Sequence, residues 1–173
     1  MELPEIEHEN HPLVMPVSVT ISILAVLVAC VTLLGHRAHT EELSRETQAA
    51  SRWTQFQAKS IRQNEADNTS DIIALVSSLD KEKGEALKKK YEAKLEHYKE
   101  DKTDVSKEAQ NLEAERDLAA HKADRFDAGE ALLEIGLVIC SITLLAKKKF
   151  FWFAGMSIAA VGLIVAATGF LLH

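Results

Sequence analysis

Residues that break helices or crosslink chains are scarce in this sequence. Its 173 residues include 3 Pro, 7 Gly and 2 Cys. Pro and Gly are the strongest helix breakers, so their scarcity predicts helix through most of the chain. Cys30 and Cys140 follow no metal-binding or redox spacing. A disulfide framework is therefore not indicated, and we interpret both cysteines as packing residues.

Charge is also scarce in three long stretches, residues 13–35, 128–146 and 150–172. About 20 mainly apolar residues cross the roughly 30 Å hydrocarbon core of a bilayer as a helix. We therefore expect three transmembrane helices at these positions. The intervening residues 36–127 are too highly charged to enter lipid. The sequence predicts an all-α membrane protein in which a long extramembrane segment separates the first span from the second.

The N-terminal segment and the link between the last two spans differ in charge. Residues 1–12 are acidic, and we expect them to form a disordered tail. The tail lacks the basic region and small-residue cleavage site of a signal peptide, so residues 13–35 should stay in place as an anchor. Residues 147–149 are three lysines and form a very short basic loop.

A row of uncharged residues recurs at seven-residue spacing in the second half of the extramembrane segment. This pattern is typical of a helix that packs against another helix along one face. A second row, from Leu95 to Leu137, mixes small and charged residues. We therefore expect a thin, partly polar contact surface. The uncharged row consists of Tyr91, Tyr98, Val105, Leu112, Ala119, Phe126, Leu133 and Cys140.

Residues 36–127 divide into two arms of similar length, which predicts an antiparallel helical hairpin, a coiled-coil-like stalk, with its turn near residues 78–84. Asp80 could cap the helix that begins at Lys81. Folding about this point places residue i opposite roughly 163 minus i, so that Trp53 lies near Ala109. Oppositely charged residues then tend to face each other. The expected pairs are Arg37–Asp127, Glu41–Lys122, Arg45–Asp117, Glu46–Arg116, Lys59–Asp104, Arg62–Asp101 and Glu65–Lys99.

A second break in the first arm is an alternative at residues 67–71. It would leave residues 72–76 as a short apolar element at the far end of the hairpin. This element would either pack on the turn of the hairpin or form a docking patch for a partner.

Small residues form a row in each expected span. Such rows let helix backbones approach closely, which is how helices associate in lipid. We expect the rows to support a homo-oligomer, with an intramolecular three-helix bundle as the alternative. The rows are Ser18, Ser22, Ala25, Ala29 and Thr32 in the first span, Gly129, Gly136, Cys140 and Thr143 in the second, and Gly155, Ala159, Gly162, Ala166 and Gly169 in the third.

The membrane orientation follows from the lysines at 147–149. Short loops obey the positive-inside bias most strictly, whereas long domains cross the membrane with little regard to charge. This places the lysine loop and the N-terminal tail in the cytoplasm and the hairpin outside, in the periplasm of a diderm bacterium. Arg37, Arg45 and Arg52 after the first span favour the opposite orientation.

Four blocks of sequence carry a resemblance to a known family. They are residues 35–43 (GHRAHTEEL), 53–62 (WTQFQAKSIR), 112–117 (LEAERD) and 123–127 (ADRFD). With the lysine-rich break between the closing spans, the chain resembles a bacterial membrane-protein family catalogued as a domain of unknown function (number four-three-three-seven). The resemblance extends from about Leu13 to the end, and Phe56 stands where relatives have Tyr. It implies a bacterial source and a chain that forms one unit, and it supplies no activity.

Four ionisable residues are candidates for chemistry at the membrane boundary. His36 and His39 follow the first span, while Glu130 and Glu134 lie one turn apart where the second begins. Imidazole and carboxylate groups on facing helices can hold a metal ion, so these four are weak metal candidates. Interfacial pairing with Arg37 and water is the favoured interpretation. Glu134 is the most informative of them, because an ionisable group inside a span is costly unless it is paired or lines water.

Other functional patterns are weaker still. Trp53, Phe56 and Lys59 could form a recognition block, although aromatic residues at helical spacing are more often core residues. The sequence has no Gly-rich phosphate loop and no nucleophile placed with a base. Residues 36–127 carry more Asp and Glu than Lys and Arg, so no basic face for nucleic acid is expected. We predict no enzymatic activity, cofactor or metal.

The expected function is structural. We predict a scaffold, or an accessory subunit of a larger membrane assembly, that self-associates in the bacterial inner membrane through the small-residue rows and the helical stalk. Trp53 and Phe56 are candidate interaction residues, as are Gly155, Ala159, Gly162, Ala166 and Gly169. The alternative is an oligomeric ion channel or transporter-like protein with Glu130 and Glu134 at the mouth of the pore. Beyond Glu134 no charged residue follows in any span, which favours the structural role.

Overall fold

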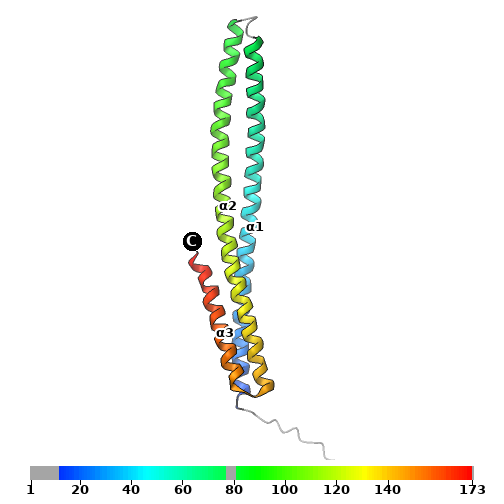
Figure 1. Cartoon of the computed structure of the whole chain (residues 1–173), viewed down its shortest axis with the longest axis vertical. Helices are drawn as coiled ribbons and strands as arrows, with labels where there is room; N and C mark the ends of the chain where they lie inside the picture. The colour runs from blue at the N-terminus through cyan, green and yellow to red at the C-terminus, as the bar shows by residue number, and fades with distance from the viewer. Residues whose placement is uncertain (1–11, 77–80, 173) are drawn as a thin grey trace, which may run out of the picture. The chain divides into compact units, whose positions relative to one another are not determined.

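The computed structural model describes residues 12–76 and 81–172, and it is all-helical over these residues. Helix α1 spans Val14–Val76, α2 spans Lys81–Ala146 and α3 spans Lys149–Thr168 (Figure 1). A short 3₁₀ helix, η1, follows at Gly169–Leu171. The scarcity of Pro and Gly explains why α1 and α2 run so far without interruption.

Helix α1 has no break at residues 67–71, so the alternative of a separate short element at 72–76 is wrong. These residues form the last turns of α1, with Ile73 buried and Ile72 60% exposed. Within this continuous helix the Thr69 hydroxyl donates to the Glu65 carbonyl at 2.7 Å. The expected cap, Asp80, and the N-terminal tail up to His11 lie outside the described residues.

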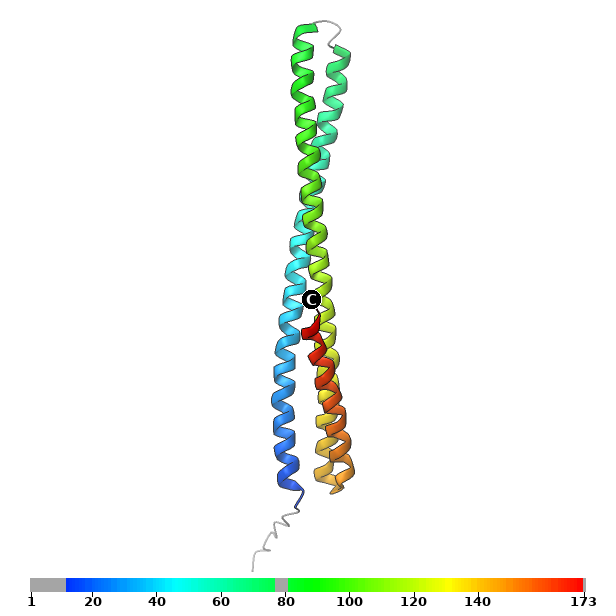
Figure 2. The same ribbon diagram turned by 90° about the vertical axis from the view of Figure 1, so that its left-hand side faces the viewer.

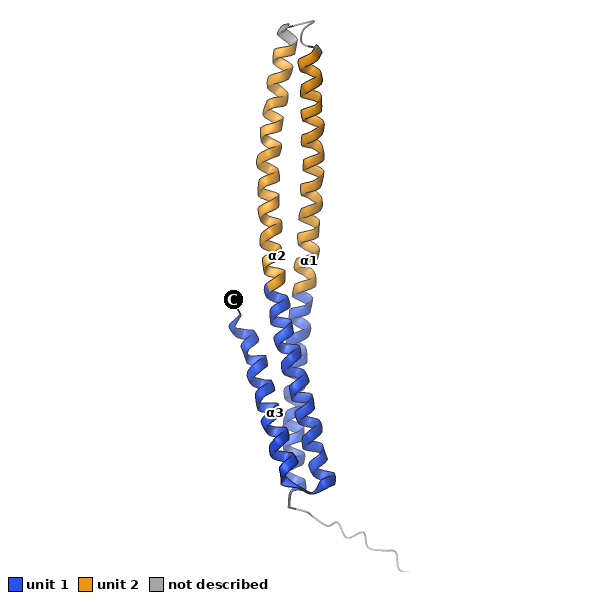
Figure 3. Cartoon of the chain, viewed as in Figure 1, with its two compact units in different colours: residues 1–41, 118–173 blue, residues 42–117 orange. Residues whose placement is uncertain are grey.

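The chain divides into two compact units (Figure 3). Unit 1 comprises Met1–Glu41 and Leu118–His173, and unit 2 comprises Glu42–Asp117. Helices α1 and α2 each contribute to both units.

Unit 1 holds the apolar parts of all three helices. Three helices are long and apolar enough to cross a membrane, as expected for a multi-pass membrane protein. On α1, the buried side chains Val17, Leu24, Val31 and Ala38 recur every seven residues. Leu24, Val31 and Ala38 join Phe126, Leu133 and Cys140 of α2 in one apolar core. Within this unit α3 lies beside α2 (Figures 1 and 2).

The link from α2 to α3 is very short. Helix α2 ends at Ala146 and α3 begins at Lys149. Lys147 has a φ of 52°, in the left-handed region, and its amide donates to the Thr143 carbonyl at 2.9 Å. This conformation reverses the chain so that α3 packs back onto α2.

Two rows of residues are buried or half-buried along α2, and both begin in unit 2 and extend along the helix into unit 1. The uncharged row from Tyr91 to Cys140 is buried or half-buried at all eight positions, and the second row from Leu95 to Leu137 is too. Helix α1 contributes Ala49, Ala66 and Ile73 as buried residues. The spacing of residues that face inward on α2 is thus as the sequence indicates, and it continues from unit 2 into unit 1.

Candidate functional site

Three cross-helix ion pairs form a regular series in unit 2, which we call the ion-pair ladder. Its distances are 2.9 Å from Arg45 Nη1 to Glu115 Oε2, 2.8 Å from Arg52 Nη2 to Glu108 Oε1 and 2.7 Å from Lys59 Nζ to Asp101 Oδ2. As the basic residues advance by seven along α1, their acidic partners retreat by seven along α2. Seven residues are about two helical turns, so all three pairs recur on one face.

The ladder corrects the expected register. Lys59 binds Asp101 instead of Asp104, and Arg45 forms an ion pair with Glu115 instead of Asp117. The side chain of Asp117 is bound by its neighbour Arg116, with Nη2 2.6 Å from Oδ1. The pairing is shifted by three residues, almost one turn. Such a shift keeps acidic residues opposite basic ones, because Asp and Glu recur every three or four residues along α2.

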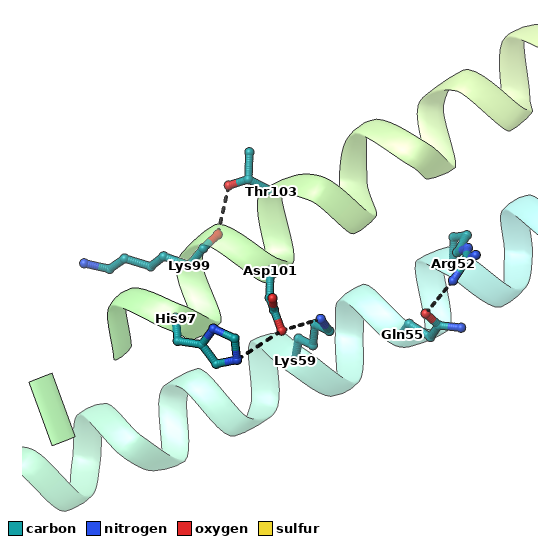
Figure 4. A network of polar contacts seen from close by, with 7 residues as sticks. All are labelled: Arg52, Gln55, Lys59, His97, Lys99, Asp101 and Thr103. Carbon is teal, nitrogen blue, oxygen red and sulfur yellow. Dashed lines mark hydrogen bonds and ion pairs between the residues drawn. The ribbon is translucent and has the colours of Figure 1, made fainter. Parts of the chain in front are cut away.

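The Lys59–Asp101 end of the ladder, drawn in Figure 4, is a small polar network. Lys59 Nζ donates to Asp101 Oδ2 at 2.7 Å, and this hydrogen bond lowers the pKa of the Asp101 carboxyl. His97 Nε2 lies 3.7 Å from the same oxygen and lowers the pKa further. Arg52 also donates to Gln55 at 3.0 Å. Charge-assisted bonds of this kind are stronger than neutral ones, which makes the pair a specific contact.

Two aromatic residues of α1, Trp53 and Phe56, contact α2 in the same part of the chain as the ladder. Trp53 Nε1 donates to Glu113 Oε1 at 2.8 Å, whereas Ala109 is its expected neighbour. The rings of Trp53 and Phe56 meet edge to face with centroids 5.4 Å apart, and Lys102 Nζ lies 5.5 Å from the centre of the Phe56 ring. Both aromatic residues are half-buried. Their contacts favour a packing role over an exposed recognition block.

In unit 1 the small-residue row of the third span lies against α2 of the same chain. We call Gly155, Ala159, Gly162, Ala166 and Gly169 the α3 row, and all five are buried. A methyl group built on Gly162 would lie 2.8 Å from the Gly129 carbonyl oxygen and 2.9 Å from Leu132 Cβ. One built on Gly136 would lie 2.9 Å from Ala159 Cβ. The α3 row therefore packs in the intramolecular arrangement that was the alternative to an oligomer contact.

The small-residue row of the first span has a different environment. Ser18, Ser22, Ala25 and Ala29, which we call the α1 row, are exposed on the surface of unit 1. Ser18 and Ser22 line a shallow apolar groove with Val19, Ile23, Val26 and Leu27. Thr32 at the end of the series is half-buried and faces α2.

The four weak metal candidates do not converge. The Thr32 hydroxyl donates to Glu130 Oε1 at 2.6 Å, and His39 Nε2 lies 3.0 Å from Asp127 Oδ2. His36 and Glu134 are exposed. The described residues contain no group of three or more His, Cys, Asp or Glu side chains that could hold a metal ion. Asp127, which was expected to pair with Arg37, contacts His39 instead.

A family model matches residues 14–172, nearly the whole chain. The chain belongs to the family described as Domain of unknown function (DUF4337). This confirms the family resemblance noted in the sequence. No curated protein and no solved structure matches the chain.

Two contacts of this DUF4337 chain were not predicted from the sequence. The ladder is visible as basic residues at 45, 52 and 59 and acidic residues at 101, 108 and 115, both at seven-residue spacing. The second contact, from Trp152 Nε1 to the Thr20 hydroxyl at 3.2 Å, joins α3 to α1 and has no comparable signal. It depends on how the two spans are rotated, which their composition does not specify.

Proposed function

We propose that this chain is a non-enzymatic scaffold, or an accessory subunit of a larger assembly, in the inner membrane of a bacterium. In this proposal unit 1 is the membrane anchor and unit 2 works outside the bilayer. The sharp division of chemistry between the units supports the proposal. Apolar helices make up the spans of unit 1, whereas charged side chains join the helices of unit 2.

The ion-pair ladder is the observation that carries the proposal. We infer that unit 2 is an antiparallel, coiled-coil-like hairpin, because partner numbers fall along α2 as they rise along α1. Exposed ion pairs contribute little free energy individually, and a polar contact surface gives up stability for a defined register. A paired-helix segment with a fixed register suits a mechanical or docking role, in which geometry matters more than chemistry.

Self-association is the second part of the proposal, and it rests on the α1 row. The α3 row is occupied inside the chain, whereas Ser18, Ser22, Ala25 and Ala29 are exposed on unit 1. Small residues on a lipid-facing helix allow a second helix to approach closely. A second copy of the chain is the proposed occupant.

The channel alternative has less support from the geometry. It requires Glu130 and Glu134 to face one aqueous path at the mouth of a pore. Instead, Glu130 accepts a hydrogen bond from Thr32 of its own chain, and Glu134 lies on the outer surface of unit 1. We therefore do not put it forward as a second function.

Native mass measurement in mild detergent tests the self-association. The wild-type complex should contain more than one chain, and Ser22→Leu should lower its mass by filling the groove on α1. Val161→Leu is the matched control, because Val161 is 51% exposed on α3 and lies away from the α1 row. A wild-type protein that is a monomer, or a Ser22→Leu variant with unchanged mass, would contradict the proposed interface.

Thiol labelling tests the orientation, with the lysine loop and N-terminal tail proposed as cytoplasmic and the hairpin as periplasmic. In a background lacking Cys30 and Cys140, a single cysteine replacing Lys83 should react with an impermeant thiol reagent in intact spheroplasts. A cysteine replacing Lys148 should not react. The reverse pattern would place unit 2 in the cytoplasm.

A further inference from the structure

Glu134 is the one acidic residue of the spans that the structure places on the outside of unit 1 without a partner. It is exposed, and its neighbours Ile135 and Val138 are 50% and 56% exposed. It makes no hydrogen bond or ion pair with any described residue. Glu130, one turn earlier, is half-buried and bound by Thr32. The two carboxyl groups thus have opposite environments on one helix.

The depth of Glu134 follows from the levels of the charged residues around the span. Helix α2 has Asp127 before the apolar stretch and Lys147 after it, about 30 Å apart at 1.5 Å per residue. Glu134 lies seven residues from Asp127, or about 10 Å into this interval. A glutamate side chain is too short to bridge that distance to water, unlike the long side chains of Lys and Arg.

Contacts with α3 give an independent measure of the depth. Glu134 lies between Gly129 and Gly136, which approach Ala166 and Ala159 of α3 respectively. It is therefore level with residues 159–166, in the second half of the α3 span and away from the lysines at its start. Glu130 is the other carboxyl near this level. The facing parts of α1 and α3, residues 14–31 and 150–168, contain no Asp, Glu, Lys, Arg or His.

We propose that Glu134 is a lipid-facing carboxyl site within the hydrocarbon layer, open to a small hydrophobic reagent that acts on carboxyl groups. The inference rests on the membrane insertion of unit 1 and goes beyond a structural role. A carboxyl group without a counter-ion is costly in lipid, and such groups mark functional positions on membrane helices. No cationic side chain of a second copy could serve, because none of the three spans contains one away from its ends.

A lipid-soluble carbodiimide tests this directly, because it reacts with a protonated carboxyl in an apolar medium. The carboxyl proton moves to one nitrogen of the reagent, and the carboxyl oxygen bonds to the central carbon. The acyl group then migrates from oxygen to nitrogen to give a stable N-acylurea. This is an addition with no leaving group, so the labelled peptide gains the full mass of the reagent.

The experiment uses the full chain in native membranes, after alkaline extraction has shown that it stays membrane-bound. Dicyclohexylcarbodiimide should label the peptide containing Glu134 at pH 7. The label should fall roughly tenfold in Glu134→Gln, and it should persist in Glu130→Gln, the matched control one turn away. A water-soluble carbodiimide should leave Glu134 unlabelled.

Three results would overturn the proposal. Equal labelling by the water-soluble reagent would show that Glu134 reaches water. Labelling in detergent but not in membranes would show that another helix covers the carboxyl. An unlabelled Glu134 in both media would show that the reagent does not reach the carboxyl. Loss of the chain from the membrane on alkaline extraction would instead contradict the anchor proposed for unit 1, so the two failures are distinguishable.

Discussion

In unit 1, α3 meets α2 through small residues, whereas in unit 2 charged and aromatic side chains link α1 to α2. In unit 1, the α3 row lets two backbones approach so closely that a methyl group on Gly162 would overlap α2. In unit 2, the ladder joins α1 to α2 through side chains that reach across the contact. The two kinds of helix contact suit different environments, lipid and water. Lipid offers no hydrophobic drive between apolar helices, so close packing must hold them, while water tolerates exposed ion pairs.

The largest effect should follow from filling the α3 row. Gly162→Leu adds a side chain where the Gly129 carbonyl oxygen and Leu132 leave no room, at a cost of about 1–3 kcal/mol. We expect α3 to separate from α2 and become easier to cleave by proteases, while helix content changes little because each span stays helical by itself. Limited proteolysis with circular dichroism measures both quantities.

Val161→Leu is the control for this experiment, since the neighbouring side chain is 51% exposed. It adds volume to the same helix without entering the contact with α2. If Gly162→Leu instead lowered the native mass of the complex and left proteolysis unchanged, the α3 row would join separate chains.

A smaller effect is expected from the ladder. Arg52→Ala and Glu108→Ala should each destabilise unit 2, and the double variant should show a coupling energy of about 0.2–1 kcal/mol. The low value follows from exposure, because the Arg52 and Glu108 side chains are 37% and 51% exposed. Thermal unfolding of the full chain in detergent measures it. Arg62→Ala combined with Glu108→Ala should be additive, and coupling of that size in this second cycle would mean that the register is wrong.

The smallest effect should be a pH dependence that comes from Asp101. Its pKa is lowered by the hydrogen bond from Lys59, so the folded protein holds this proton less tightly than the unfolded chain does. The contribution to stability is present above the ordinary carboxyl pKa of 3.8 and is lost as the pH falls through the lower folded value. The midpoint of unfolding should therefore differ most between wild type and Asp101→Asn at pH 6, and the difference should shrink towards pH 3.

Asp104→Asn is the matched control for the pH experiment, three residues further along α2. Asp104 is exposed and is not the partner of Lys59. Its variant should follow the wild-type pH profile. A larger effect from Asp104→Asn than from Asp101→Asn would favour the register expected from the sequence.

Much of the fold follows from one-dimensional patterns. The apolar spans are long runs with little charge, and the row from Tyr91 to Cys140 repeats every seven residues. Such patterns are compatible with few alternative structures, so the sequence predicts them well. The register of unit 2 is harder, because acidic residues recur at almost every turn of α2 and a shift by three residues still pairs opposite charges. Lys59 therefore had two plausible partners, Asp101 and Asp104, and charge alone does not choose between them.

The candidate site was harder still to predict. A row of small residues indicates close packing but does not identify the helix that covers it. Geometry decides this: Gly162 meets Gly129 of its own chain, whereas Ser18 and Ser22 remain exposed. In the same way, Glu130 and Glu134 look alike in the sequence. The rotation of α2 about its axis brings Glu130 within hydrogen-bond distance of Thr32 and places Glu134 on the outer surface of unit 1.

Disulfide formation across the ladder tests the central claim most directly. Lys59→Cys combined with Asp101→Cys, with Cys30 and Cys140 both replaced by Ala, should form a disulfide or accept a short crosslinker within one chain. Lys59→Cys combined with Asp104→Cys should do so much more slowly. Mass spectrometry of the full chain in membranes distinguishes bonds within a chain from bonds between chains. Rapid intramolecular bonding is expected for the first pair, and faster bonding of the second pair, or bonding only between chains, would contradict the Lys59–Asp101 register.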